Sequence, residues 1–164
     1  MKVLVTGGVR SGKSAHAEGL LADRPAVTYV AAGPVPGPDD TDWAERVAAH
    51  VTRRPAHWST LESTTLSALP DGPVLLDCLG TWLTAQLDDL DWDDSALGPR
   101  VDALVDAVSR STDLVVVTNE VGAGVVPEHR SGRIFRDQLG LVNQRVAAVC
   151  DEVHLVVAGR VLVL

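Results

Sequence analysis

The chain has 164 residues, 46% of them hydrophobic and 14 of them glycine, which favours one compact α/β domain over residues 1–164. Its formal charge of −8 at pH 7 argues against nucleic acids and anionic membranes as partners, because a negative field repels polyanions. Cys78 and Cys150 form no C-x-x-C pair and no apolar run is long enough for a secretory or membrane-spanning segment, so we expect a cytoplasmic protein without a disulfide framework.

Short β-branched runs alternate with longer amphipathic stretches, the pattern of parallel strands joined by crossover helices. We expect strands at Lys2–Thr6, Val27–Ala31, Val74–Cys78, Leu114–Thr118 and Val153–Val157. We expect helices at Lys13–Ala22, Trp43–Val51, Leu79–Leu87, Ala96–Ser109 and Ser131–Val149. A last strand at Val161–Leu164 follows its predecessor too closely for a crossover, so it should form an antiparallel hairpin at the sheet edge.

The most informative motif lies between the first strand and the first helix. The phosphate-binding pattern G-x-x-x-x-G-K-[ST] is formed by Gly7, Gly8, Val9, Arg10, Ser11, Gly12, Lys13 and Ser14. Glycines let successive backbone N–H groups face one anion, and the following helix adds its positive end. Lys13 would contact the β- and γ-phosphates, and the Ser14 hydroxyl would bind Mg²⁺. We therefore predict a nucleoside triphosphate site in a P-loop NTPase-like fold, with a mostly parallel sheet flanked by helices; the alternative is a glycine-rich turn that has lost its ligand.

Polar residues follow two further strands, at the edge where open α/β sheets bind ligands. Asp77 ends an apolar run and is the candidate acid for the metal, with helix capping as the alternative. Asn119 and Glu120 end another run, where either residue could instead stabilise the turn. The N-K-x-D element of switch GTPases is absent, which leaves a small-molecule kinase or a nucleotidyltransferase. Residues 33–40, rich in Pro and Gly, are long enough for a lid.

Further blocks occur in order along the chain. They read R-P-A-H-W at 54–58, L-D-C-L at 76–79, T-N-E-V-G at 118–122, V-V-P-E at 125–128 and V-N-Q-R at 142–145. With the phosphate loop, they resemble the bifunctional adenosylcobinamide kinase/adenosylcobinamide-phosphate guanylyltransferase family over nearly the whole chain. The resemblance implies phosphorylation of the corrinoid adenosylcobinamide with ATP or GTP, then transfer of GMP from GTP to that phosphate through a guanylylated histidine. It also implies a propeller-like homotrimer.

The resemblance places the acceptor histidine at His50, with His57 as the competing candidate; without it, His50 is typical of a surface helix residue. A neutral imidazole is nucleophilic near pH 7, and its phosphoramidate can pass GMP onward. The other GTP contacts that the resemblance implies are Ala31, Ala32, Gly33, Val51, Thr52, Arg53, Arg54, Glu62 and Asp77. Arg53 and Arg54 suit a phosphate in an acidic protein, whereas Glu62 could simply pair with an arginine.

Two segments depart from the family pattern. Residues 127–133 read P-E-H-R-S-G-R instead of P-E-N-R-L-A-R, and residues 78–85 read C-L-G-T-W-L-T-A instead of C-L-T-x-W-L-T-N. The second change removes a hydroxyl and an amide beside the predicted metal acid. Three alternatives follow: a guanylyltransferase without kinase activity, a small-molecule kinase without a covalent intermediate, or a nucleotide-binding module without chemistry.

Several side chains are predicted to support the fold. Trp58 and Trp82 should pack in the core or at a subunit interface, with a ligand pocket as the alternative. His16 and His154 are predicted to be structural.

Overall fold

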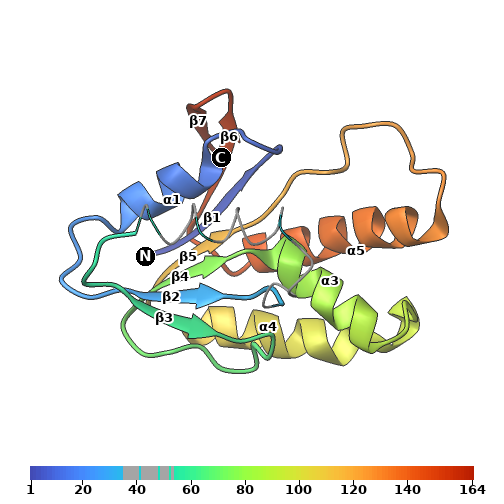
Figure 1. Cartoon of the computed structure of the whole chain (residues 1–164), viewed down its shortest axis with the longest axis horizontal. Coiled ribbons are helices and arrows are strands. Elements are labelled where there is room, and N and C mark those ends of the chain that lie inside the picture. The colour runs from blue at the N-terminus through green and yellow to red at the C-terminus, as the bar shows by residue number, and fades with distance from the viewer. Residues whose placement is uncertain (35–40, 42–47, 49–51, 53) are drawn as a thin grey trace.

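The structure is a computed structural model that describes residues 1–34, 41, 48, 52 and 54–164. In this part of the chain a seven-stranded sheet has the strand order β3-β2-β4-β5-β1-β6-β7 (Figure 1). The strands are β1 (Lys2–Gly7), β2 (Thr28–Ala31), β3 (Ser59–Glu62), β4 (Pro73–Asp77), β5 (Asp113–Val117), β6 (Glu152–Val157) and β7 (Arg160–Val163). The neighbouring pairs are parallel except β6 and β7, which form an antiparallel hairpin. The predicted fold class, including its edge hairpin, is confirmed.

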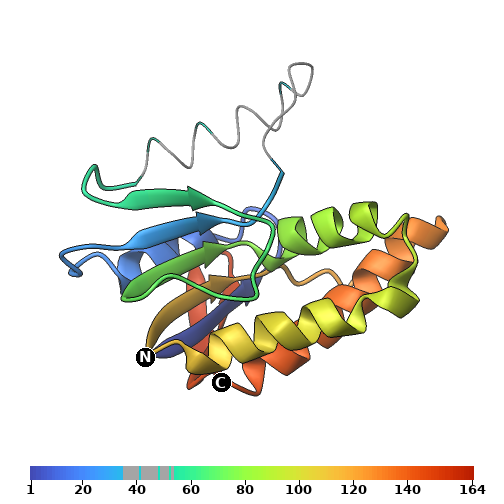
Figure 2. The ribbon, with the colours of Figure 1, turned by 90° about the horizontal axis from the view of Figure 1, so that it is seen from below.

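Helices cover both faces of the sheet. They are α1 (Lys13–Leu20), α3 (Leu79–Asp89), α4 (Gly98–Arg110) and α5 (Arg130–Ala147), with a 3-10 turn at Asp94–Ala96. Figures 1 and 2 show α1 apart from α3, α4 and α5, which lie together. None of the helices in the described ranges has the length and apolar character needed to cross a membrane.

Two clusters of buried side chains lie on opposite faces of the sheet. On the α1 side, Ala17 and Leu21 pack with Val3 and Val5 of β1. On the other side, Leu4 of β1 packs with residues of α3, α4 and α5. Consecutive residues of β1 therefore enter different clusters, because side chains alternate across a strand. Burial on both faces explains why the central strands read as continuous apolar runs.

The tryptophans and the histidine pair behave as predicted. Trp58 and Trp82 are buried, with relative exposures of 9% and 2%. His16 Nε2 lies 2.8 Å from His154 Nδ1, and His154 Nε2 lies 2.8 Å from Glu152 Oε2. This chain of contacts ties α1 to β6, which agrees with a structural role for both histidines.

Two elements, β3 and α4, differ from the prediction. Two predicted segments lie largely outside the described residues. Strand β3 was not predicted because its sequence, Ser-Thr-Leu-Glu, is exposed at every position and lacks the apolar signature of a strand. Helix α4 begins at Gly98 rather than Ala96, since residues 94–96 form the 3-10 turn. The predicted helix at 43–51 lies, apart from residue 48, outside the described residues, as does the proposed lid beyond residue 34.

Candidate functional site

The phosphate loop, residues 7–14, joins β1 to α1 in a tight turn. The Ser11 amide donates to the carbonyl oxygen of Gly8 (3.3 Å), and the His16 amide donates to that of Gly12 (3.0 Å). Gly12 has a φ of 97°, a left-handed conformation that favours glycine. The Gly159 amide, in the β6–β7 turn, donates to the Ser11 carbonyl oxygen (2.9 Å). The hairpin therefore supports the loop from the side.

Hydroxyl and ammonium donors gather at this loop. Lys13 Nζ donates to the carbonyl oxygen of Gly8 at 3.2 Å, so the ammonium folds back across the loop. The buried hydroxyls of Thr6 and Ser11 have no hydrogen-bond partner in the described part of the chain. Together with the positive end of α1, this donor set fits an anion such as phosphate.

Strand register brings three of the predicted nucleotide residues to the same edge of the sheet. Ala31 pairs with Glu62 on one side and with Asp77 on the other. Asp77 in turn pairs with Val117 at the end of β5, and Val117 pairs with Val5 of β1. The strand that ends in Asp77 is thus separated from the phosphate-loop strand by β5. Both strands nevertheless end at the same side of the molecule.

Asp77 shares the sheet face of α1. Leu75, two residues earlier in β4, belongs to the same apolar cluster as Ala17 of α1, and residues two apart in a strand point the same way. The hydroxyl of Tyr29 donates to Asp77 Oδ2 at 3.0 Å. Asp77 and the half-buried Ser14 therefore lie on one face of the sheet, as a shared ion would require.

This donor set suits Mg²⁺ better than a cation that needs a full cage of side chains. Among the described residues there is no group of three or more His, Cys, Asp or Glu side chains that could hold a metal. Mg²⁺ commonly uses one or two protein oxygens together with substrate phosphates and water. Ser14 and Asp77 would supply those protein oxygens.

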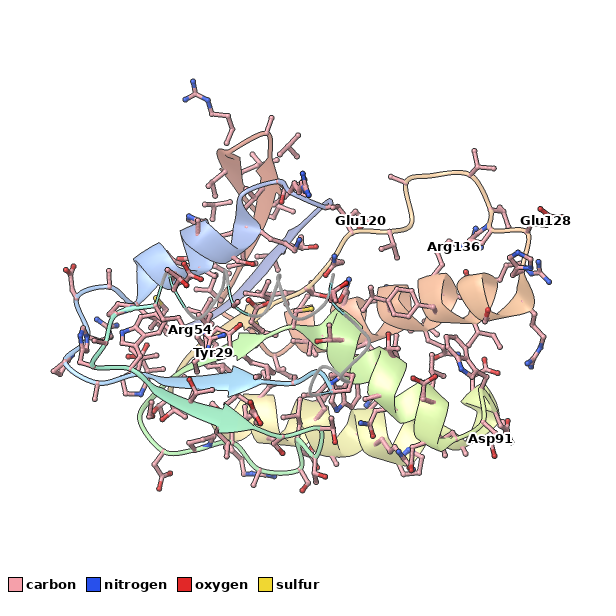
Figure 3. The ribbon with its side chains drawn as sticks, viewed as in Figure 1. Tyr29, Arg54, Asp91, Glu120, Glu128 and Arg136 are labelled. Carbon is pink, nitrogen blue, oxygen red and sulfur yellow. The ribbon has the colours of Figure 1, made fainter. Side chains whose placement is uncertain are left out.

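Arg54 and Tyr29 form a stacked pair (Figure 3). The guanidinium carbon of Arg54 lies 3.3 Å from the centroid of the Tyr29 ring, and Arg54 Nη1 donates to Thr60 Oγ1 at 3.2 Å. Burial, and next the Asp77 carboxylate, raise the pKa of Tyr29 above its ordinary value, so its hydroxyl stays protonated. No sequence motif marks Tyr29; the available signal was that it is the only tyrosine of the chain and lies in an apolar strand.

The remaining predicted contacts are placed unevenly. Ala32 is buried, while Ala31 and Gly33 are half-buried at the end of β2. Thr52 is exposed and its hydroxyl donates to the Ala48 carbonyl oxygen at 2.9 Å. His57 is exposed. Three further predicted site residues lie outside the described residues, namely His50, Val51 and Arg53.

Hydrogen bonds join the end of β5 to both α5 and the phosphate loop. The Thr118 hydroxyl donates to Asn143 Oδ1 (2.6 Å), and Asn143 Nδ2 donates to the Asn119 carbonyl oxygen (3.1 Å). The Glu120 amide donates to the carbonyl oxygen of Gly7 (3.1 Å). The β5 end is therefore held in place by side chains of α5.

Two of the departures from the family pattern are glycines in crowded places. A Cβ on Gly80 would lie 3.3 Å from Asn119 Oδ1. A Cβ on Gly132 would lie 2.8 Å from the Pro127 Cβ. In this chain a larger residue at either position would have to displace its neighbour, so the substitutions agree with the local packing.

Residues 118–129 arch from β5 to the start of α5 (Figures 1 and 3). Arg133 Nη1 holds the far end by donating to the Pro127 carbonyl oxygen at 3.1 Å. At the tip, Val125 and Val126 are 94% and 59% exposed.

A groove of about 420 Å³ is lined by Gly122, Arg136, Asp137, Gly140, Leu141 and Gln144. The groove runs along α5. Its lining residue Gly122 lies two residues after Glu120, whose amide is bonded to Gly7 of the phosphate loop.

Comparison with known proteins yields a consistent set of relatives. The sequence model of a family described as cobinamide kinase / cobinamide phosphate guanyltransferase matches residues 3–164. The bifunctional adenosylcobalamin biosynthesis protein CobU of Salmonella typhimurium is 44% identical over 178 aligned positions, covering 97% of each chain. CobU of Escherichia coli is 42% identical with the same coverage. The bifunctional adenosylcobalamin biosynthesis protein CobP of Pseudomonas aeruginosa is 39% identical, covering 97% of this chain and 94% of the relative.

Proposed function

The chain belongs to the cobinamide kinase / cobinamide phosphate guanyltransferase family, and we propose that it catalyses both reactions on adenosylcobinamide. The first phosphorylates the aminopropanol hydroxyl with ATP or GTP. The second transfers GMP from GTP to the resulting phosphate, giving adenosylcobinamide-GDP and pyrophosphate. The observation that carries the proposal is the alignment of the strand ends, which brings the phosphate loop, Asp77, Ala31 and Glu62 to the same edge of the sheet.

The residues at this edge have different roles in binding the triphosphate. The backbone N–H groups of the phosphate loop bind its oxygens, and Lys13 Nζ turns from the Gly8 carbonyl oxygen to stabilise the charge that develops during transfer. Ser14 and Asp77 would hold Mg²⁺, which would supply positive charge to neutralise the phosphates. Arg54 adds a second cation beside Asp77.

His50 is the proposed nucleophile of the second reaction. An imidazole nitrogen attacks the α-phosphorus of GTP, a P–N bond forms, and the bond from that phosphorus to the bridging oxygen breaks to release pyrophosphate. A phosphate oxygen of adenosylcobinamide phosphate then attacks the same phosphorus, the P–N bond breaks, and the free imidazole returns. The length of the chain keeps the Cα of His50 within about 14 Å of that of Arg54, four residues later, which is compatible with a place near the proposed nucleotide site.

Incubation with α-labelled GTP tests the covalent step. The label should remain on the protein, survive base and be released by acid, as expected of a phosphoramidate. His50→Ala should abolish the adduct, whereas the matched control His57→Ala should keep it. An adduct on the His50→Ala protein that disappears in His57→Ala would transfer the role to His57.

The departure at Gly80, close to Asp77, favours one alternative: a guanylyltransferase that has lost its kinase activity. Transfer of label from γ-labelled ATP or GTP to adenosylcobinamide would establish the kinase reaction. A protein that forms the α-label adduct but transfers no γ-label would be a guanylyltransferase alone. Transfer of γ-label without any adduct would instead indicate a small-molecule kinase without a covalent intermediate.

The proposed binding site of the corrinoid is the groove along α5. A macrocycle fringed with amides needs an open, largely apolar surface with a few hydrogen-bonding groups. Leu141 offers such a surface at 54% exposure, and Gln144 and Arg136 offer polar groups. The amide contact between Glu120 and Gly7, two residues before the lining residue Gly122, supports a position of the groove near the phosphate loop.

We also propose a homotrimer in the cytoplasm. Strand β7 is an edge strand with exposed apolar residues on both faces, Val161 and Val163 on one and Leu162 on the other, which association of subunits would cover. Cys78 and Cys150 are free thiols, as suits a reducing compartment. Analytical ultracentrifugation should give three times the mass of one chain, and a monomer at all concentrations would contradict the trimer.

A further inference from the structure

Tyr29 connects two groups of opposite charge at the edge of the sheet. It lies in β2 with 3% exposure, and its ring packs in the apolar cluster on the α1 side. Its hydroxyl donates to Asp77 Oδ2 at 3.0 Å, and its ring face carries the Arg54 guanidinium at 3.3 Å. Figure 3 shows Tyr29 and Arg54 together over the strands of the sheet.

Apolar packing alone does not account for a tyrosine at this position. The apolar cluster that holds the ring also contains Leu75, the register partner of Tyr29 in β4, and any large apolar side chain could pack there. A buried hydroxyl destabilises the fold unless it is hydrogen-bonded, and this one is bonded to the predicted metal acid. The hydroxyl thus gives Asp77 a hydrogen bond that a phenylalanine at position 29 could not make.

The ring also determines how Arg54 is presented. A guanidinium stacked on an aromatic face is held in place above the ring, and its N–H groups point outward in its own plane. Arg54 Nη1 donates a hydrogen bond to the Thr60 hydroxyl oxygen, whereas the buried Arg54 Nε has no hydrogen-bond acceptor in the described part of the chain. A buried donor without an acceptor is costly in a folded protein and suits a site that receives an anion.

We propose that Tyr29 is a positioning residue of the nucleotide site, which orients Asp77 for Mg²⁺ through its hydroxyl and Arg54 for the phosphates through its ring. This inference rests on the proposed function. One side chain touches both groups, so it fixes the separation between the acid and the cation.

Single substitutions separate the two roles. Tyr29→Phe keeps the ring under Arg54 and removes only the hydroxyl, whereas Arg54→Lys keeps a positive charge and removes the planar stack. Binding of a fluorescent GTP analogue is measured as Mg²⁺ is titrated in. Tyr29→Phe should raise the Mg²⁺ concentration at half-maximal binding by about tenfold, the effect expected for one hydrogen bond to a charged group. Its affinity at saturating Mg²⁺ should match the wild type.

Arg54→Lys should show the opposite pattern, with weaker nucleotide affinity at saturating Mg²⁺ and an unchanged Mg²⁺ midpoint. A matched control is Ser111→Ala, which removes a hydroxyl that donates to the Ala107 carbonyl oxygen (3.0 Å) in α4, far along the chain from the site. That variant should alter neither quantity. A double-mutant cycle completes the test, because Tyr29→Phe should have no further effect on Mg²⁺ dependence in an Asp77→Asn background.

The outcomes are distinct. A Tyr29→Phe protein that has a lower melting temperature but the wild-type Mg²⁺ midpoint would overturn the inference, since the hydroxyl would then serve the fold alone. An equal shift in the midpoint with and without Asp77 would overturn it as well. Failure of the wild type to bind the GTP analogue would instead refute the proposed function itself.

Discussion

The two glycines that open the phosphate loop should respond very differently to the same added methyl group. A Cβ on Gly7 would contact the carbonyl oxygen of Val156 and would lie 2.7 Å from Ser11 Oγ. A Cβ on Gly8 would meet nothing within 4 Å. Gly7→Ala and Gly8→Ala therefore form a pair in which the same methyl group enters a crowded site or open space, and Gly7 has in addition a φ of 159°, which L side chains rarely adopt.

The size of the effect follows from what must move. Gly7 pairs with Val156 in the register of β1 and β6, so the obstructing atom belongs to the backbone of a neighbouring strand. Inserting a methyl into such a packed site costs about 1–3 kcal/mol. Since 1 kcal/mol shifts Tm by about 2–4 °C in a domain of this size, a cost of about 2 kcal/mol for Gly7→Ala should lower Tm by about 4–8 °C. Gly8→Ala should change Tm by less than about 3 °C, because alanine fits there and reduces the entropy of the unfolded chain.

Thermal unfolding followed by circular dichroism, without nucleotide, measures this difference directly. Measurement without nucleotide matters because a ligand that binds only the folded state raises Tm by itself. Equal Tm values for the two variants would refute the argument that the β6 backbone restricts the first position of the loop. So would a larger loss in Gly8→Ala than in Gly7→Ala.

Three other predictions concern titration, thiol reactivity and the groove. Burial, and next the charge of His154, lower the pKa of His16 below its ordinary 6.5, so the folded chain binds fewer protons than the unfolded one as the pH falls through this range. The free energy of unfolding of the protein, measured by urea denaturation, should therefore decline from about pH 7.5 to about pH 5.5. His16→Gln should make that decline smaller. Burial raises the pKa of Cys78, and it raises that of Cys150 to about 11. A thiol reagent should therefore label neither cysteine quickly at about pH 8 unless urea is added. Fast labelling of the native protein would contradict this. Leu141→Glu should raise KM for adenosylcobinamide phosphate at least about fivefold and leave the GTP adduct intact, and an unchanged KM would remove the corrinoid from the groove.

Much of the fold follows from local patterns in the sequence. The central strands β1, β4 and β5 are apolar runs because both of their faces are buried, and such runs can be read without knowledge of their neighbours. The phosphate loop is equally local, since its glycines and its lysine act within eight residues of chain. The family blocks added His50 and the other implied contacts, which local patterns could not have provided.

The tertiary structure alone decided which of these parts meet. Nothing in the sequence placed β5 between β1 and β4, because the order of strands depends on how helices pack on the two faces of the sheet. The polar strand β3 forms because β2 offers it an unpaired edge, and its register brings Glu62 beside Ala31. Tyr29 resembles an ordinary core residue until Asp77 is seen at one end of it and Arg54 on its face. Contacts between residues distant in sequence arise only when strands are aligned, so they leave no trace in local periodicity.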